Sequence, residues 1–394
     1  MHTVIESFAF LAYLDSLLVE VQARDVTPGR AVPDTLNLLH AQAMREHARG
    51  SALLYREDVN WQPTPDWRLD RQVIRLALAL RERVGVEPGQ RIALVSELRP
   101  EWLIADLAAL GLGTVSAAID PRLQGDALTS ALEDAEPRVI FVSAAAQQTL
   151  ERLDGRLPPS GRLITLGHAP SSGGSIALSE LLEVGGTLDT PERAQAYRAD
   201  ARGVGPDRPA VRHYRKAAGA EGEGAWDVVE WSQGEVIEQL RSGWLREQAR
   251  SGDVAYVSDP TASPAARLAL YAFLGDGYTS TALAPAGREL SDLAELRPTK
   301  IVAPAAVLAE VVRAGLAGVE EQSGSNGGWV RYASRLAPLA RARRDRRAIR
   351  EILGGRARRI GSIDSLDSAL AERLGGVAVV GTAPIRSFNE GGGV

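Results

Sequence analysis

The sequence predicts an α/β fold built on mainly parallel sheets. Three observations support this fold class: short apolar runs alternate with amphipathic stretches, glycine and proline separate them, and the composition suits a large folded core. Of 394 residues, 45% are hydrophobic and 24% are charged, which favours a globular chain of about two domains. When strands alternate with helices that are long enough to cross back over a sheet, neighbouring strands pair in parallel.

The alternation is clearest in the first half of the chain. An amphipathic stretch at 36–47 precedes it, and Pro88 and Gly89 mark a turn within it. The expected elements, in chain order, are a strand at 52–55, a helix at 70–84, a strand at 91–96, a helix at 101–110, a strand at 114–119, a helix at 125–133 and a strand at 139–143. The strands are apolar runs without strict alternation, as expected when both faces of a sheet are covered.

The second half repeats this style after a break. A Gly/Ser-rich stretch at 171–175 and a polar, proline-containing stretch at 199–209 predict a boundary near residue 205. Strands or short buried helices are expected at 254–257, 268–274, 300–302 and 376–380. We therefore expect an N-terminal amphipathic helical extension at 1–30, a first α/β subdomain at 31–205 and a second, shortened α/β subdomain at 206–394.

The N-terminal extension carries an apolar stripe. Phe8, Leu11, Leu14 and Leu18 fall near helical spacing, so they are expected to cover the chain's own body or to dock on a partner or membrane surface. The segment lacks a basic start and is interrupted by acidic residues. A signal peptide and a membrane-spanning helix both fit it poorly, which favours a cytoplasmic protein.

An arginine-rich segment stands near the end of the chain. Residues 335–359 hold ten arginines against one aspartate and one glutamate. We expect Arg341, Arg343, Arg344 and Arg347 either to form a solvated face or to contact a protein partner or an anionic membrane, peripherally. Nucleic acid is not favoured as a partner, because the net charge of the chain is -5.

The residue inventory excludes several mechanisms. The chain has no cysteine, hence no thiolate nucleophile or thiolate metal site. Its only lysines are Lys216 and Lys300, and arginine does not act as a general base. No GxSxG, HExxH or GxxxxGK[ST] motif is present. His40 and His47 are two helical turns apart, too far to hold one ion without a third element, so no metal site is expected.

The first half contains segments such as VEPGQRIALVSELRPEWLIADLAALGLGTVSAAIDPRL. Through these segments it resembles long-chain acyl-CoA synthetases of the adenylate-forming superfamily, and the likeness is most specific over 89–143. It continues more faintly to about residue 390. The resemblance implies the large N-terminal domain of the acyl-adenylating fold, with two βα subdomains. Set against that family, we expect the small C-terminal lid to be absent.

The family's phosphate-binding loop, similar to YTSGTTGxPKG, is replaced in this chain. Tyr214 holds the first position, and Lys216 follows where hydroxyls should stand. Gly219, Gly222 and Gly224 keep the segment loop-like. We therefore interpret these five residues as a vestigial phosphate loop, in which Lys216 and Arg215 are the remaining candidates to reach a phosphate.

The rest of that loop argues against ATP. No hydroxyl side chain stands between Tyr214 and Ser232, while Glu221 and Glu223 introduce carboxylates where a polyphosphate would lie. A like charge at about 4 Å costs roughly 1 kcal/mol in water and several times more in a partly dry site. Residues 258–273 lack the histidine that the resemblance implies, and residues 381–389 lack its glutamate.

These departures define the expected function. The chain is expected to be a catalytically inactive acyl-CoA synthetase-like pseudoenzyme, without cofactor or catalytic residues, that acts as a scaffold, assembly or regulatory subunit with a protein partner or a second copy of itself. Two alternatives stay open. One is a divergent AMP-forming fatty-acid–CoA ligase that uses ATP and Mg²⁺ through Lys216, and the other is an acyl-chain-binding protein without ligase activity.

Overall fold

The computed structural model describes most of the chain from Leu36 onward. The described residues are 36–39, 41, 50–57, 60–151, 161–167, 174–216, 226–242, 249–259, 263–284, 287–324, 337–364, 366–374 and 378–381. The apolar stripe of Phe8, Leu11, Leu14 and Leu18 lies outside them, and the amphipathic stretch at 36–47 is described only in part.

One seven-stranded sheet, here called sheet B, has the strand order β7-β6-β5-β3-β4-β8-β9. Its strands are β3 (Arg91–Val95), β4 (Val115–Ile119), β5 (Val139–Val142), β6 (Arg162–Thr165), β7 (Ile176–Ala177), β8 (Pro209–Lys216) and β9 (Trp226–Ser232). All neighbours are parallel except β8 and β9, which form an antiparallel pair. Parallel strands therefore end at one common edge, beside the β8–β9 turn.

The second seven-stranded sheet, sheet A, has the order β14-β13-β12-β10-β11-β1-β2. Its strands are β1 (Leu53–Glu57), β2 (Asn60–Thr64), β10 (Asp253–Ser258), β11 (Thr279–Ala284), β12 (Lys300–Ala303), β13 (Arg359–Ser362) and β14 (Ala378–Gly381). Only β2 runs antiparallel to its neighbour. This sheet thus combines a hairpin from the first half of the chain with strands from the second half.

Helices cover both faces of the two sheets. In chain order they are α3 (Asp66–Ala79), continued by the π-helical turn η1 (Leu80–Val84), α4 (Pro100–Gly111), α5 (Gly125–Ala135), α6 (Ala144–Glu151), α7 (Leu178–Leu188), α8 (Pro191–Arg202), α9 (Gln233–Ser242), α10 (Pro264–Asp276), α11 (Glu289–Leu296), α12 (Ala305–Gly324), α13 (Ala337–Ile352) and α14 (Ser368–Arg373).

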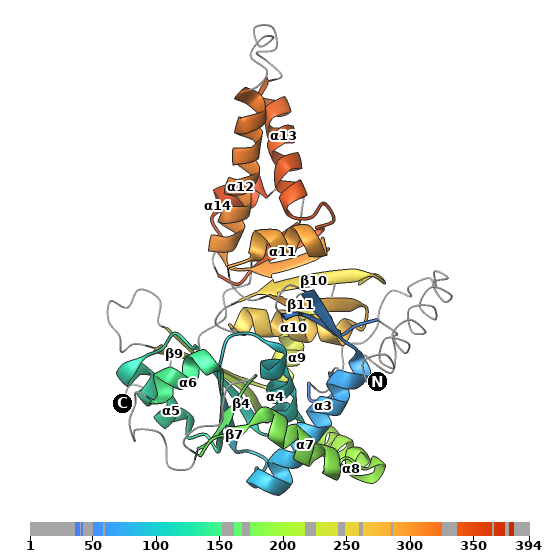
Figure 1. Cartoon of the computed structure of the whole chain (residues 1–394), viewed down its shortest axis with the longest axis vertical. Helices are drawn as coiled ribbons and strands as arrows, with labels where there is room; N and C mark the ends of the chain where they lie inside the picture. The colour runs from blue at the N-terminus through green and yellow to red at the C-terminus, as the bar shows by residue number, and fades with distance from the viewer. Residues whose placement is uncertain are drawn as a thin grey trace, which may run out of the picture. The chain divides into compact units, whose positions relative to one another are not determined.

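The largest hydrophobic cluster lies between the sheets. It joins buried residues of α3, α4, α9 and α10 to inward faces of both sheets, including Leu94 of β3 and Val257 of β10, and Figure 1 shows α4 and α10 there. A second cluster packs α5 and α6 on the outer face of sheet B. A third packs α11, α12 and α13 on the outer face of sheet A. The α/β class with mainly parallel sheets is confirmed.

Residues at its two ends explain where α10, the helix that links the two sheets, begins and ends. The side chain of Ser263 accepts a hydrogen bond from the backbone of Ala266, Pro264 occupies the first turn, and Gly277 ends α10 with φ +70°. These are the N-cap, N1 and C-terminal glycine preferences of an α-helix. The expected element at 268–274 is therefore part of a longer buried helix, α10, and not a strand.

Gly111, at the end of α4, marks another close contact. A Cβ at this position would lie 1.8 Å from the hydroxyl oxygen of Tyr197 in α8. The close approach is therefore between two helices, α4 and α8. The division of the chain at residue 205 stays a prediction. Strands on either side of it share each sheet, since β8 pairs with β4 and β1 pairs with β11.

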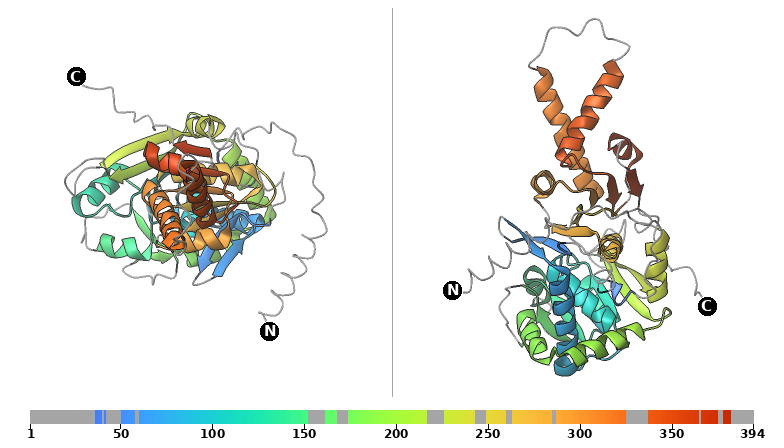
Figure 2. Two further views of the ribbon diagram at one scale, coloured as in Figure 1. Left: turned by 90° about the horizontal axis from the view of Figure 1, so that it is seen from above. Right: turned by 90° about the vertical axis from the view of Figure 1, so that its right-hand side faces the viewer.

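The helices α12 and α13 form a pair on the outer face of sheet A. Figure 1 shows them leaving the sheet side by side, and the right view of Figure 2 shows them crossing near the sheet and spreading apart toward their far ends. Gly315 permits their contact, since a Cβ there would lie 3.0 Å from the Cα of Ile349. No helix in the described ranges is long and apolar enough to cross a membrane.

Candidate functional site at the carboxyl edge of the sheets

The β8–β9 hairpin brackets the vestigial phosphate loop. Lys216, the last residue of β8, is paired with Trp226 at the start of β9. The connecting residues, with Gly219, Gly222 and Gly224, lie outside the described part of the chain, as does the side chain of Lys216. The loop therefore begins at the common carboxyl edge of β4 and β8, where open parallel sheets place their ligands.

Tyr214 is directed into the protein at this edge. Its side chain is buried against α5, and its hydroxyl donates to a carboxylate oxygen of Asp134 at 2.6 Å. Burial, followed by this hydrogen bond, raises the pKa of Tyr214 well above its ordinary value. The phenol thus stays protonated and serves as a donor within the fold.

Arg212 lies on the same side of β8 as Tyr214. Its guanidinium pairs with Asp134 and, at 2.8 Å, with Glu230 of β9, and it stands 5.3 Å from the centre of the Tyr214 ring. This cation therefore ties the hairpin to α5 and is neutralised by two carboxylates. The side chains of the hairpin that the structure describes have structural partners.

Arg122, which follows β4 in the chain, also pairs with a carboxylate. The guanidinium of Arg122 binds Asp120 in a two-pronged contact, with Nη2 2.7 Å from Oδ2 and Nε 3.0 Å from Oδ1. The hydrogen bond with Asp120 is the main cause that raises the pKa of Arg122, and the charge of Asp259, beyond β10, adds to it. Asp120 and Asp259 are both buried. This edge therefore brings two carboxylates to one cation.

A buried polar network lies beneath the edge. Arg267 of α10, with 1% of its side chain exposed, forms an ion pair with the fully buried Asp106 of α4. Its Nη1 donates to the backbone oxygen of Ser116 in β4 at 3.2 Å, and lies 3.3 Å from Nε2 of His213 in β8. Tyr271 completes the group by donating from its hydroxyl to Asp106 at 2.6 Å.

The network connects elements of both sheets. It binds α10, which packs on sheet A, to α4, β4 and β8 of sheet B. Burial opposes the charge of the guanidinium, but Asp106 and Tyr271 outweigh it and raise the pKa of Arg267. Burial also raises the pKa of Tyr271, so the phenol stays a donor. We call this set Asp106, Ser116, His213, Arg267 and Tyr271 the buried network.

The sequence analysis did not single out this network. Its signal was present, because Asp106 is the only acidic residue in the apolar run WLIADLAALG and Arg267 is the only charge in PAARLALYAF. An isolated charge on an otherwise apolar helix needs a buried partner. The pairing itself spans 161 positions of sequence, which no local pattern specifies.

Lys300 lies at the opposite edge of sheet A. It begins β12, is buried, and its ammonium group is 3.3 Å from Asp276 and 3.7 Å from Asp253. These partners precede β11 and begin β10. The amino-terminal edge of a parallel sheet faces away from the ligand edge, so this lysine is structural.

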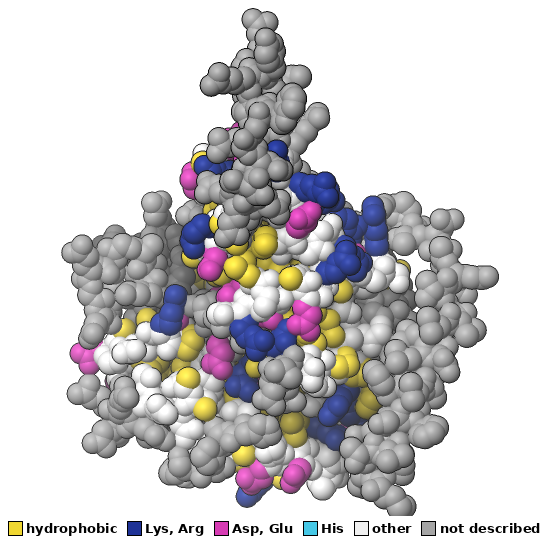
Figure 3. Space-filling view, turned by 45° about the horizontal axis from the view of Figure 1, so that its top comes forward, with side chains coloured by type: hydrophobic (Ala, Val, Ile, Leu, Met, Phe, Trp, Pro, Cys, Tyr) yellow, Lys and Arg dark blue, Asp and Glu magenta, His cyan; other side chains and the backbone are white. Residues whose placement is uncertain are grey.

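The arginine-rich helix α13 is exposed where its side chains are described. Arg344 and Arg347 are exposed, whereas the side chains of Arg341 and Arg343 lie outside the description. Arg347 pairs with Glu351 at 3.1 Å, with 83% and 67% of the two side chains exposed. Such a pair contributes about 0.3–0.5 kcal/mol. On the face in Figure 3 the described cations form several separate clusters.

At the carboxyl edge, the described cations already have acidic partners. A triphosphate needs cations and hydroxyl or amide donors, but the described cations Arg122 and Arg212 already bind carboxylates. The loop sequence adds two further carboxylates and no hydroxyl. In the described part of the chain, no group of three or more His, Asp or Glu side chains could hold a metal ion.

Comparisons with known proteins agree with this fold. Residues 67–214 match the family model described as AMP-binding enzyme. The long-chain-fatty-acid–CoA ligase FadD15 of Mycobacterium bovis is 29% identical over 124 residues, 31% of this chain and 20% of that protein. The 4-hydroxybenzoate–CoA/benzoate–CoA ligase of Rhodopseudomonas palustris is 33% identical over 100 residues, 25% of this chain and 18% of that ligase.

Solved structures extend the likeness in fold to most of the chain. The adenylation domain of the carboxylate reductase from Mycobacterium chelonae has a TM-score of 0.66 at 19% identity, covering 95% of this chain and 62% of that one. The long-chain-fatty-acid-CoA ligase FadD1 from Archaeoglobus fulgidus has a TM-score of 0.61 at 13% identity, covering 90% and 62%. These identities show the fold alone.

The chain is thus related to the AMP-binding enzymes and has the fold of their large N-terminal domain. More particularly it is acyl-CoA ligase-like, so the resemblance stated for the sequence is confirmed. The match spans only 20% of the length of FadD15.

Proposed function

We propose that this acyl-CoA ligase-like chain does not form acyl adenylates and serves as a scaffold, assembly or regulatory subunit. The observation that carries the proposal is the β8–β9 hairpin, which is formed and tied to α5 by Arg212 and Tyr214. The segment it presents lacks hydroxyls and contains Glu221 and Glu223. This combination of a formed hairpin and a connecting segment without hydroxyls supports the proposal that phosphate binding has been lost.

Electrostatics at the edge support this proposal. A triphosphate would approach Asp120 and Asp259, whose partner Arg122 is already engaged. Each uncompensated like charge near 4 Å costs about 1 kcal/mol in water and about 4 kcal/mol in a partly buried site. Because Arg122 is engaged by Asp120, it is not available to a phosphate, and the carboxylates of Glu221 and Glu223 would add repulsion that weakens nucleotide affinity.

The proposed role requires a partner. We propose a protein partner or a second copy of the chain, in the cytoplasm, with an anionic membrane surface as a further contact through the arginines of α13. Nucleic acid is not favoured, given the net charge of -5.

Pyrophosphate exchange tests the absence of catalysis. The purified chain is incubated with ATP, Mg²⁺, labelled pyrophosphate and a panel of fatty acids and benzoate, beside an active acyl-CoA ligase. We expect exchange no faster than without enzyme. Acid-dependent and Mg²⁺-dependent exchange well above that level would contradict the proposal.

A divergent ligase is the second candidate, favoured by the position of Lys216. This lysine ends β8 where the loop begins, so its backbone lies at the edge where a phosphate would lie. If exchange is observed, Lys216→Ala should abolish it. Arg202→Ala, a change of the same charge at the exposed end of α8, should leave it unchanged.

Native mass spectrometry tests the partner. The full chain and a chain lacking residues 1–25 are purified from the source cell under gentle conditions and compared. We expect the full chain in a complex or oligomer, and a smaller share of assembly without the apolar stripe. Two lone monomers would remove the support for a scaffold role.

A further inference from the structure

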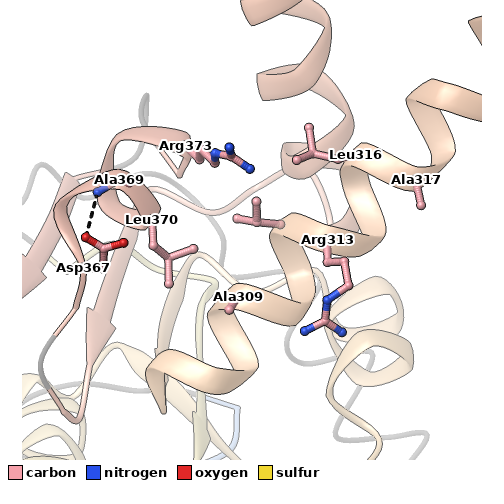
Figure 4. A pocket seen from close by; sticks show the side chains of 9 residues that line it. Ala309, Arg313, Leu316, Ala317, Asp367, Ala369, Leu370 and Arg373 are labelled. Carbon is pink, nitrogen blue, oxygen red and sulfur yellow. Dashed lines mark hydrogen bonds between the residues drawn. The ribbon is translucent and has the colours of Figure 1, made fainter.

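A groove between α12 and α14 lies on the outer face of sheet A. Its volume is about 560 Å³, within the roughly 300–1,000 Å³ that holds small organic ligands. Val312 and Leu316 of α12 and Leu370 of α14 provide apolar walls, together with small alanine side chains. Figure 4 shows Leu370 facing α12 across the gap between the helices.

Two cations stand at the rim of this groove. Arg313 and Arg373 are exposed, and neither has an ion pair or hydrogen bond with a described residue. In Figure 4 Arg373 extends from α14 toward Leu316, whereas Arg313 points downward from α12, away from Arg373. Guanidinium groups keep their charge at any physiological pH. The rim therefore carries a permanent positive field.

The carboxylate of Asp367 does not cancel this field. Its Oδ1 accepts a hydrogen bond from the backbone N–H of Ala369 at 3.3 Å, and it caps the first turn of α14. Asp367 keeps its negative charge, so two guanidinium groups against one carboxylate leave the lining with a net positive charge. The lining favours a ligand that is apolar in its body and negative at one end.

We propose that the groove between α12 and α14 binds a small organic anion with an apolar body. The apolar part lies against Val312, Leu316 and Leu370, and the anionic group is held by Arg373, with Arg313 adding to the attraction. The length of α14 favours a small molecule over a docked peptide. Its six residues span about 9 Å, less than two turns of a helical partner need.

Titration with octanoate tests this site. Isothermal calorimetry compares octanoate with the neutral octan-1-ol on the full chain, on Arg373→Gln and Arg313→Gln, and on Arg346→Gln. The last variant removes one exposed arginine of α13 outside the groove. We expect Arg373→Gln to weaken octanoate about tenfold, Arg313→Gln about threefold and Arg346→Gln not at all, with octanol weaker than octanoate.

A filled groove provides a second variant. Ala309→Trp places an indole in a lining position that is only partly buried, so folding is retained and octanoate binding should disappear. Binding that survives both Ala309→Trp and Arg373→Gln, or that falls equally in Arg346→Gln, would overturn the proposal. Absence of octanoate binding by the parent chain would also overturn it. None of these outcomes depends on pyrophosphate exchange.

Discussion

Replacing Asp106 by leucine leaves Arg267 charged and buried without an anion. Only 1% of the guanidinium side chain is exposed, and that of Asp106 is fully buried. Removing one partner of a buried ion pair costs about 3–5 kcal/mol, because the remaining charge cannot reach water. Arginine cannot lose its proton to escape this cost. We therefore expect Asp106→Leu to lower the free energy of unfolding by about 4 kcal/mol.

The reciprocal change, Arg267→Met, should cost less. Asp106 would retain two donors, the hydroxyl of Ser116 at 2.7 Å and that of Tyr271 at 2.6 Å. Hydrogen bonds to a charged group contribute about 1.5–3 kcal/mol each, so we expect a loss of about 2–3 kcal/mol. The double variant removes both charges and should cost no more than about 2 kcal/mol, mostly from hydroxyls left without partners.

Urea unfolding followed by circular dichroism measures the three variants and the parent. The shift in midpoint gives the free-energy change, and an unchanged slope shows that the unfolded state is comparable. The two sites should couple by more than about 3 kcal/mol in the double-mutant cycle. A double variant as unstable as the two single changes combined, or an Arg267→Met less stable than Asp106→Leu, would refute the reasoning.

Two further predictions concern other sites. Gly185→Ala in α7 should lower the free energy of unfolding by about 1–3 kcal/mol, because its Cβ would lie 2.1 Å from the backbone oxygen of Arg75 in α3. The control is Gly186→Ala, whose Cβ would meet nothing nearer than 3.8 Å, and it should be neutral or slightly stabilising. The midpoint of urea unfolding measures both variants. Burial raises the pKa of Asp292, although the charge of Arg56 opposes this shift. The contribution of Asp292 to the free energy of unfolding is therefore complete below about pH 4 and is lost as the pH rises through the raised pKa. The melting temperature of the parent relative to Asp292→Asn should therefore fall as the pH rises above about pH 4. A difference that grows in favour of the parent over this rise would contradict the prediction.

The parallel elements could be predicted from the sequence because each is specified locally. The run at 91–96 is apolar and follows a Pro-Gly turn, and β3 is found at Arg91–Val95. The helix expected at 101–110 is α4, Pro100–Gly111, which has proline in its first turn. Hydrophobic periodicity and turn residues decide such elements without reference to distant parts of the chain.

Pairing between distant segments could not be predicted in the same way. The hairpin β1–β2 joins β11, with Leu53 opposite Thr281, and β8 joins β4 although a boundary was expected between them. Apolar strands are interchangeable in local pattern, so the pairing depends on side-chain packing across the sheets. The groove depends likewise on the approach of α14 to α12, which follows from the position of β13 beside β12.

Strand β8 is held from both of its sides by contacts between protein groups. His213 fixes β8 from one side through Arg267, and Arg212 and Tyr214 fix it from the other side through Asp134. All of these contacts are made between protein groups, so the hairpin needs no phosphate to stay in place. The α12–α14 groove belongs to another face, packed on the outer side of sheet A. A ligand there would therefore bind whether or not the loop can hold ATP.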